Sequence, residues 1–483
     1  MSVSSMNPSR LSLRPWAAAV IALSGFVSLV ATYWDDAWHT DLGRDSARIP
    51  PHLWLYGSVA VAGAAVIGWG VRSLLATRSL RAVLRQSPLL VAAAGGAATL
   101  AAAPLDAVWH ASFGRDAVLW SPPHMLVIFA SAAMILGVIT GTARSRSGAV
   151  EALLAGLLLG TAAMTVMEYE TDVPQFSEAL YLSVLLVAAL STAVVARAYV
   201  PTRAPVTAMV VVYIALRLVA AVVLGLLGRT APELPVAILG LGVLDLPWRN
   251  MILRYSAGAA AVSLLAWLAS VTGLVSRSAS EVAVVAVPVL VVFAVVLIAT
   301  VRRGWPIVLA LFAIAASAGL IGIAPPASAH DPGEGEPVLG AHVTGGSDGQ
   351  GMLSLTVRTD SPCTGLVPTR VVARRAGQTI RGSLLVQGDC QYSGSVRVPA
   401  DGRWLVYAEL RRGDENIEAW LPLDADRATA VTESRDLYRP AEATASTRWV
   451  QIAAGAGIYA LAIGLVGAAA AVALHRRREV AAA

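Results

Sequence analysis

The sequence contains no lysine, only two cysteines and little charge of either sign. Charged residues make up 14% of the 483 residues and apolar residues 56%, whereas a typical soluble domain has about 25% charged residues. This composition excludes an ordinary soluble protein. All of the basic charge comes from arginine, and the arginines cluster in short loops. Such clustering is a membrane-topology signal rather than a nucleic-acid footprint, so we expect no nucleic-acid partner.

Apolar runs of about 20 residues recur along the chain, and each is long enough to cross a bilayer. The sequence therefore predicts an α-helical polytopic membrane protein whose main partner is the lipid bilayer. We expect about twelve spans, at about 15–34, 53–73, 88–105, 125–142, 149–168, 178–197, 205–228, 235–246, 252–274, 281–301, 305–324 and 449–474.

The arginines also predict the orientation of these spans. Residues 1–14 carry Arg10 and Arg14, and the loops R-S-L-L-A-T-R-S-L-R, T-A-R-S-R-S-G and A-R-A-Y-V-P-T-R are basic, which places them in the cytoplasm. The run 235–246 is short for a full crossing and is otherwise a re-entrant or tilted segment. We favour a crossing, because the basic tail 475–483 then lies inside. The predicted location is the inner membrane of a bacterial cell.

A different pattern follows the transmembrane domain 15–324. Residues 337–430 consist of short alternating runs broken by turn dipeptides such as D-G and G-D, which is typical of an antiparallel β-sandwich of about seven strands. We expect residues 325–447 to form an extracytoplasmic β-sandwich domain, inserted before a C-terminal span at 448–474. Cys363 and Cys390 both lie in it, which predicts a disulfide in an oxidising compartment; two free thiols are the alternative.

One polar stretch at the end of an apolar run occurs twice. The two copies share nine identities at an offset of 71 to 72 residues, with a single one-residue gap. Each copy joins two spans, so the chain contains an internal two-helix repeat, with units 15–73 and 88–142. Two copies in the same orientation are related by an axis along the membrane normal. The matching segments are 35–39 with 106–110, 43–45 with 114–116, and 50–52 with 122–124.

The spacing within a copy has a chemical meaning. Asp35 and His39 are four residues apart, so they share one face of a helix. Pro50 and Pro51 suit the first turn of the next helix, which places His52 at its start. One carboxylate and two imidazoles therefore converge with an open position, a ligand set that suits copper, with zinc or iron as alternatives. The predicted metal ligands are Asp35, His39 and His52, and Asp106, His110 and His124.

Acidic residues near the membrane are weaker candidates. Glu168, Glu170 and Asp172 lie at the outer end of the fifth predicted span. They either complete a metal site or a proton relay, or they form a solvated loop. Arg217 falls in the middle of a predicted span, where a buried charge needs a partner or a cavity. Asp245 is one candidate partner.

Two histidines of the predicted outer domain are further candidates. His330 follows A-P-P-A-S-A, which contains a leader-peptidase pattern. Cleavage after Ala329 would leave His330 as an amino terminus able to chelate copper, and an uncut linker is the alternative. His342 is the other candidate ligand.

The motif resembles a known one. Asp35, His39 and His52 follow D-x3-H-x12-H, which is similar to the copper-site signature in the C subunit of the copper membrane monooxygenases, the methane and ammonia monooxygenases. The second copy fits with one extra residue. The resemblance covers this motif only, and it implies a copper site where two transmembrane helices meet. The duplicated pattern also looks like uncharacterised bacterial membrane proteins, and the C-terminal region looks like β-sandwich domains found with copper-handling and oxidase-assembly proteins.

Three functions are compatible with these patterns. The first is a monooxygenase-like oxidative metalloenzyme that acts on a small or lipid-like substrate at the outer membrane face. The second is a copper transporter or a metal-insertion factor, with other membrane subunits or copper-handling proteins as partners. The third is a transporter or scaffold without metal, in which the repeat is a hydrogen-bonded network that closes a loop. A bis-histidine haem is disfavoured, because Gly43, Pro50 and Pro51 prevent a continuous helix between His39 and His52.

Overall fold

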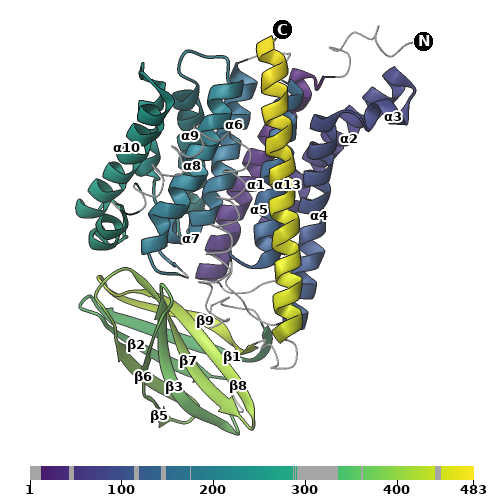
Figure 1. Cartoon of the computed structure of the whole chain (residues 1–483). Helices are drawn as coiled ribbons and strands as arrows, with labels where there is room; N and C mark the ends of the chain where they lie inside the picture. The colour runs from purple at the N-terminus through teal and green to yellow at the C-terminus, as the bar shows by residue number, and fades with distance from the viewer. Residues whose placement is uncertain are drawn as a thin grey trace.

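The computed structural model of the chain has two parts, a bundle of helices and a β domain at one end of it (Figure 1). The helices come from residues 15–271, 279–286 and 448–482, and the strands from residues 335–440. The structure describes residues 12–42, 48–113, 119–142, 148–174, 176–286, 288, 290, 335–360, 363–440 and 448–482.

Nine helices in the described residues are long and apolar enough to cross a membrane, which makes the chain a multi-pass membrane protein. They match nine of the predicted spans; those at about 281–301 and 305–324 lie almost entirely outside the described residues, so twelve spans are not confirmed. The nine are α1 (Pro15–Asp41), α2 (Pro50–Thr77), α4 (Ser87–Phe113), α5 (Pro122–Thr142), α6 (Ala149–Ala163) extended by η3 (Met164–Val166) and α7 (Met167–Glu170), α8 (Ala179–Tyr199), α9 (Pro205–Leu226), α10 (Met251–Val271) and α13 (Arg448–Ala482); the short α3 (Leu80–Val83) joins α2 to α4.

Prolines fix where the helices of the repeat begin. α2 starts at Pro50 and α5 at Pro122, each the first residue of a double proline. Proline suits this position because its ring presets the helical φ angle and it lacks an N–H that would remain unpaired. His52 and His124 are therefore each the third residue of a helix.

The chain crosses the bundle once more without forming an α-helix. η4 (Val236–Asp245) is a 3-10 helix of ten residues, and at about 2 Å per residue it rises only about 20 Å. Before it, Thr230 donates hydrogen bonds to Asp41 at the end of α1. At its end, Asp245 accepts hydrogen bonds from Thr207 at the start of α9, which is the opposite end of the bundle. The segment thus runs from one end of the bundle to the other, which agrees with the crossing favoured for residues 235–246.

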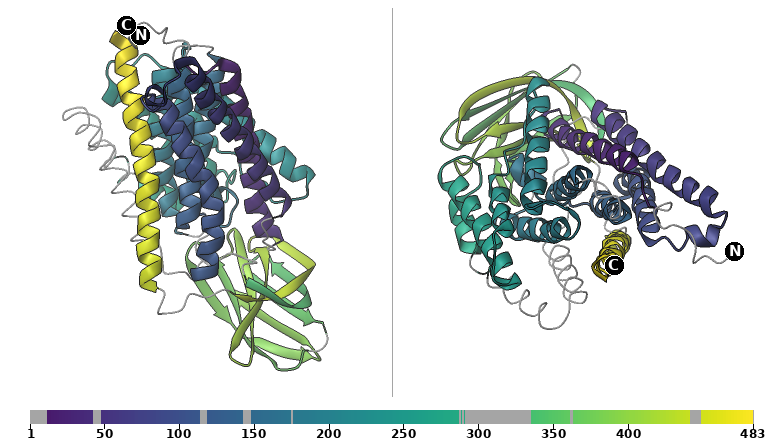
Figure 2. Two further views of the ribbon diagram at one scale, coloured as in Figure 1. Left: turned by 90° about the vertical axis from the view of Figure 1, so that its right-hand side faces the viewer. Right: turned by 90° about the horizontal axis from the view of Figure 1, so that it is seen from above.

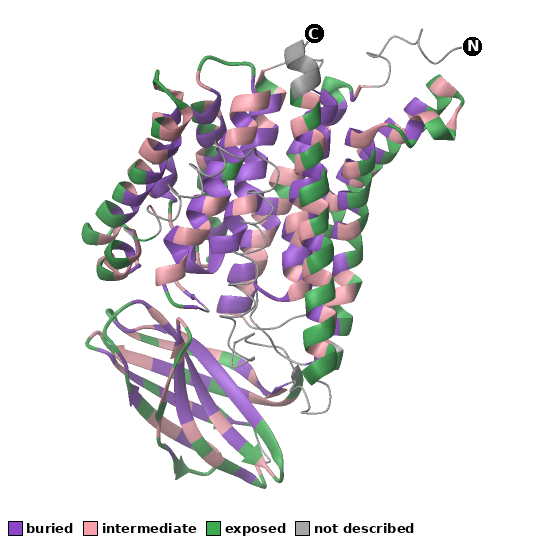
Figure 3. Cartoon of the chain, viewed as in Figure 1, coloured by how far each residue is buried: buried purple, intermediate pink, exposed green. Residues whose placement is uncertain are grey.

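The helices differ in how far they are covered. α5 and α6 lie inside the bundle and are mostly buried, whereas α13 runs along its outside and is exposed over much of its length (Figures 2 and 3). α13 packs mainly against α5 and, less extensively, against α4. The C-terminal helix is therefore an outer layer on the second repeat unit.

The β domain is one antiparallel sheet of nine strands in the order β4-β3-β7-β8-β9-β1-β2-β6-β5. The predicted β domain is present, but it is a single sheet instead of a sandwich of about seven strands. β3 and β4 at one edge contact β5 and β6 at the other, so the sheet curls into a nearly closed barrel around an apolar core. The strands are β1 (Gly335–Asp348), β2 (Met352–Thr359), β3 (Leu366–Arg375), β4 (Gln378–Gly382), β5 (Leu384–Gly388), β6 (Gln391–Arg397), β7 (Arg403–Arg412), β8 (Glu415–Asp424) and β9 (Ala428–Pro440).

The predicted disulfide is confirmed. Cys363 lies just before β3 and Cys390 just before β6, and their Cα atoms are 5.5 Å apart across the bond. Neither cysteine of the chain is free. The bond closes a loop of chain that contains β3, β4 and β5, the strands at which the two edges of the sheet approach each other.

Buried arginines fix the β domain on the bundle. Arg375 at the end of β3 forms ion pairs of 2.8 Å with both Asp172, just after α7, and Glu178, just before α8. Burial raises the pKa of the Glu178 carboxyl, although Arg375 opposes this effect. Arg435 on β9 donates to the backbone carbonyl of Leu42, just after α1. The β domain therefore lies at the end of the bundle where α1 ends.

Candidate metal centres

The first copy of the repeated motif forms a compact group. Asp35 and His39 lie four residues apart near the end of α1, and His52 reaches them from the start of α2. Asp35 Oδ1 is 3.7 Å from His39 Nε2 and 3.1 Å from His52 Nε2. The two imidazole rings are 6.4 Å apart between centroids, at an angle of 49°.

The second copy has almost the same geometry. Asp106 Oδ1 is 3.2 Å from His110 Nε2 and 3.4 Å from His124 Nε2. The ring centroids are 6.3 Å apart and the rings are inclined at 54°. The sequence repeat is therefore also a structural repeat, and its extra residue before the double proline does not change the arrangement.

These distances fit a shared metal ion. In each group, one ligand atom per residue lies within 4.8 Å of the others. Two nitrogen or oxygen ligands about 2.1 Å from one ion at a tetrahedral angle are about 3.4 Å apart. Asp35 Oδ1 and Asp106 Oδ1 are buried atoms that face the imidazole nitrogens of their groups at 3.1–3.7 Å. The alternative, a pair of hydrogen-bonded Asp–His contacts without metal, has similar distances.

Both groups lie at the end of the bundle that carries the β domain. α1 has 27 residues and is about 40 Å long, which exceeds the hydrocarbon thickness of about 30 Å. Asp35 and His39 are in its last two turns, beyond an apolar stretch that is long enough to span the hydrocarbon core. The side chains are partly covered: His39 is 10% exposed and His124 33% exposed. The groups are thus at the level of a membrane boundary and remain accessible.

The two groups are neighbours without merging into one. α2 of the first hairpin packs against α4 of the second. Among the described residues, however, the ligand atoms fall into two separate sets of three. The arrangement therefore offers two adjacent mononuclear positions.

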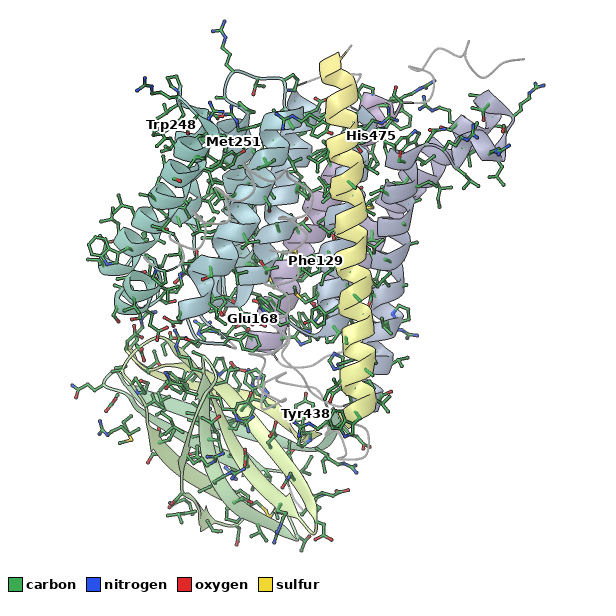
Figure 4. All side chains as sticks on the ribbon, viewed as in Figure 1. Phe129, Glu168, Trp248, Met251, Tyr438 and His475 are labelled. Atoms are coloured by element: carbon green, nitrogen blue, oxygen red, sulfur yellow. A yellow bond between two sulfur atoms is a disulfide. The ribbon has the colours of Figure 1, made fainter. Side chains whose placement is uncertain are left out.

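The acidic residues of the fifth span do not join either group. Glu168 and Glu170 are buried, so the expectation of a solvated loop is wrong for them. Glu168 accepts a hydrogen bond from the backbone of Leu119, 2.9 Å away, just before the start of α5, and it lies at the β-domain end of the bundle (Figure 4). Asp172 pairs with Arg375. These carboxylates stabilise the fold around the second group instead of extending its ligand set.

The predicted pairing of Arg217 with Asp245 is wrong. Arg217 is fully buried and pairs with Glu170, donates to the hydroxyl of Tyr213 at 2.9 Å, and lies 4.7 Å from the ring centre of Tyr33. Asp245 instead pairs with Arg197, 3.3 Å away. The reason is topological: η4 carries Asp245 to the end of α9 opposite from the β domain, beyond the reach of Arg217.

The remaining histidine candidates do not form a third group. His342 is an exposed residue on β1, opposite Ser434 of β9, and it belongs to neither ligand set. His330 and the proposed cleavage site after Ala329 lie outside the described residues. α1 ends at Asp41, nine residues before α2 begins, so no continuous helix carries both His39 and His52, as expected.

Some residues around the site were not predicted. Asp41, six residues after Asp35, ties the end of α1 to the α9–η4 loop through Thr230, and Arg229 lies over the ring of Trp38 at 5.6 Å. No sequence signal links these segments, because they are about 190 residues apart. The site is therefore held by contacts from outside the repeat.

Comparison with protein-family models gives no match, and comparison with curated proteins gives none either. The assignment therefore depends on the residues of this chain.

Proposed function

We propose that the protein is a copper-binding integral membrane protein that acts as a monooxygenase-like oxidative metalloenzyme, with its two sites at the outer face of a bacterial inner membrane. The observation that carries this proposal is the convergence of one carboxylate and two imidazoles in each of two hairpins, with matching geometry. The motif resemblance to the copper membrane monooxygenases points the same way.

The chemistry of the ligands supports copper. A set of imidazole nitrogens and one carboxylate oxygen suits copper, zinc or iron, and it leaves an open position. Bound copper would supply redox and oxygen chemistry. The chain's own contribution is to hold three donors together: the aspartate lies between two histidines from different helices, and its position fixes both rings.

The outer location is supported by charge and by redox chemistry. Arg78, Arg81 and Arg85 follow α2 at the end of the bundle opposite from the β domain, and arginine-rich loops remain in the cytoplasm. The β domain carries a disulfide, which favours an oxidising compartment. Because the β domain and the two metal groups share one end of the bundle, both are proposed to face outward.

A second candidate function is copper transport or insertion of copper into another protein. The partial exposure of His124 and the neighbouring β domain favour exchange of an ion with a partner. The two ligand groups consist of aspartate and histidine, whereas cysteine and methionine are the ligands that suit a Cu(I) pathway. For this reason we place the oxidative enzyme first.

Metal analysis of the purified full-length protein tests the proposal. We expect two copper ions per chain, and one ion in either His52→Ala or His124→Ala, because each substitution removes one ligand of one group. His342→Ala and His475→Ala are matched controls and should retain both ions, since these histidines lie outside the groups.

Near-zero metal in the wild-type protein after loading with copper would refute the proposal, as would equal metal in all variants. Zinc or iron in place of copper would support the metal site but refute copper as its metal. Oxygen consumption then separates the two functions: the enzyme consumes oxygen in the presence of a reductant and an apolar substrate, whereas a copper handler does not.

A further inference from the structure

The two hairpins of the repeat differ in what covers their outer groove. On the second hairpin, α13 fills it. Leu126 and Ala130 of α5 pack with Ala462 of α13 in one buried cluster. Gly455 lies so close to Trp109 and Pro122 that an added Cβ would be 3.2 Å from each. This groove is therefore a binding surface for a transmembrane helix.

On the first hairpin, the equivalent groove is open among the residues that the structure describes. Trp54 takes the place of Leu126, yet it is 59% exposed where Leu126 is 2% exposed. The groove has a volume of about 570 Å³, and no part of the described chain fills it. It is mostly apolar and is lined by Leu23, Ser24, Val27, Leu53, Trp54, Gly57, Ser58 and Val61.

The residues at the helix–helix contact differ between the two hairpins. In the second hairpin, Gly95 on α4 allows close packing, because an added Cβ would be 2.6 Å from the backbone oxygen of Ala130 on α5. Ser24 holds the corresponding position on α1, and Val27 corresponds to Ala98. The larger side chains line a slot in which a partner can insert.

The face of α13 that points away from the bundle is suited to a second contact with a helical hairpin. Gly457, Gly464 and Gly467 are exposed, and an added Cβ at any of them would meet nothing within 4 Å. Ala453 and Ala460 are exposed on the same helix. Small residues let helix backbones approach closely in a membrane, where packing drives association.

We propose that α13 of a second copy of the chain occupies the α1–α2 groove, so that the protein assembles by a head-to-tail contact. The two hairpins have the same orientation, with both ligand groups at the β-domain end. A second copy has the same orientation in the membrane. Its α13 therefore runs along the first hairpin of this copy in the same direction as α13 runs along the second hairpin within one chain. Such a contact between different surfaces closes into a ring when the rotation permits.

The contact that α13 makes with the second hairpin is the reason to propose a helix of this chain, and not lipid, as the occupant of the groove. Exposed apolar residues on a membrane helix ordinarily face lipid tails, and exposure alone would indicate nothing more. Here the same structural unit is present twice, and one of its two copies already binds this helix. The proposal does not depend on bound metal, so its failure would leave the proposed function intact.

The first test is the mass of the full-length protein in lipid nanodiscs and in mild detergent, measured by light scattering. We expect an oligomer for the wild-type protein and a monomer for the double variant Gly457→Leu, Gly464→Leu. These substitutions leave the packing of the described residues within one chain unchanged, because the positions have open space around them. Gly225→Leu on α9, which is equally open, is the matched control and should remain oligomeric.

Cross-linking between two differently tagged chains identifies the surfaces. One chain carries Gly57→Cys in the groove and the other carries Gly464→Cys; the two native cysteines do not interfere because they are bonded to each other. We expect a disulfide product that contains both tags, and none when Gly225→Cys replaces Gly464→Cys. A monomeric wild-type protein in both environments would overturn the proposal, as would an oligomer whose cross-link does not require these two positions. In either case the groove is left to lipid or to a helix of another protein.

Discussion

Replacement of Arg217 by methionine is expected to destabilise the protein by about 3–5 kcal/mol, which is the cost of breaking a buried ion pair by removing one partner. Arg217 and Glu170 are both 0% exposed. In Arg217→Met, the Glu170 carboxylate stays in the interior without its counter-charge, and the backbone carbonyl of Glu233 loses the guanidinium that it contacts.

A double variant distinguishes the effect of losing the Arg217–Glu170 ion pair from the effect of leaving one unpaired charge buried. In Arg217→Met, Glu170→Leu, no charge remains to be neutralised, and replacing a buried pair by apolar residues is often neutral or stabilising. We therefore expect the double variant to recover most of the lost stability. Thermal unfolding in detergent, followed by near-UV circular dichroism, measures both. A single variant as stable as the wild-type protein, or a double variant worse than the single one, would contradict this account.

Removal of the central carboxylate is expected to have the largest effect on metal binding. In Asp35→Ala, two imidazoles remain without the oxygen that lies between them at 3.1 and 3.7 Å. Loss of an outer-shell partner weakens metal affinity by about 10–100-fold, and a direct ligand should cost at least the upper end of that range. Asp106→Ala should weaken the second site to a similar extent.

The repeat itself supplies the control. Asp36 is buried beside Asp35 but belongs to neither ligand set, and the second copy has Ala107 at this position. Asp36→Ala should therefore keep copper affinity near the wild-type value. Competition titration against a copper chelator measures the affinities. The account is wrong if Asp35→Ala and Asp36→Ala weaken binding equally.

Much of this site could be predicted because its determinants are local. Apolar runs of about 20 residues fix the helices, and a four-residue spacing puts Asp35 and His39 on one face. The double proline then fixes the start of α2 and so the place of His52. Each of these steps involves neighbouring residues, and the duplication repeats them independently in the second hairpin.

Contacts between distant segments could not be predicted in this way. Arg217 pairs with Glu170 rather than Asp245 because η4 carries Asp245 away from it, and parity alone does not reveal which side chains meet. Likewise, the alternating pattern of residues 337–430 predicts strands but not their order. The strand order places β1 beside β9, strands about 90 residues apart, and Glu418 of β8 pairs with Tyr438 of β9, which joins all nine strands into one sheet.

Each hairpin is proposed to hold one metal ion between one aspartate and two histidines. Pulsed electron paramagnetic resonance of the copper-loaded protein tests this proposal most directly, because it counts the imidazole nitrogens bound to each Cu(II). We expect two imidazoles per copper in the wild-type protein. In His52→Ala, one copper site should be altered while the other keeps its signal. Copper without bound imidazole, or a spectrum unchanged in both His52→Ala and His124→Ala, would contradict the proposal.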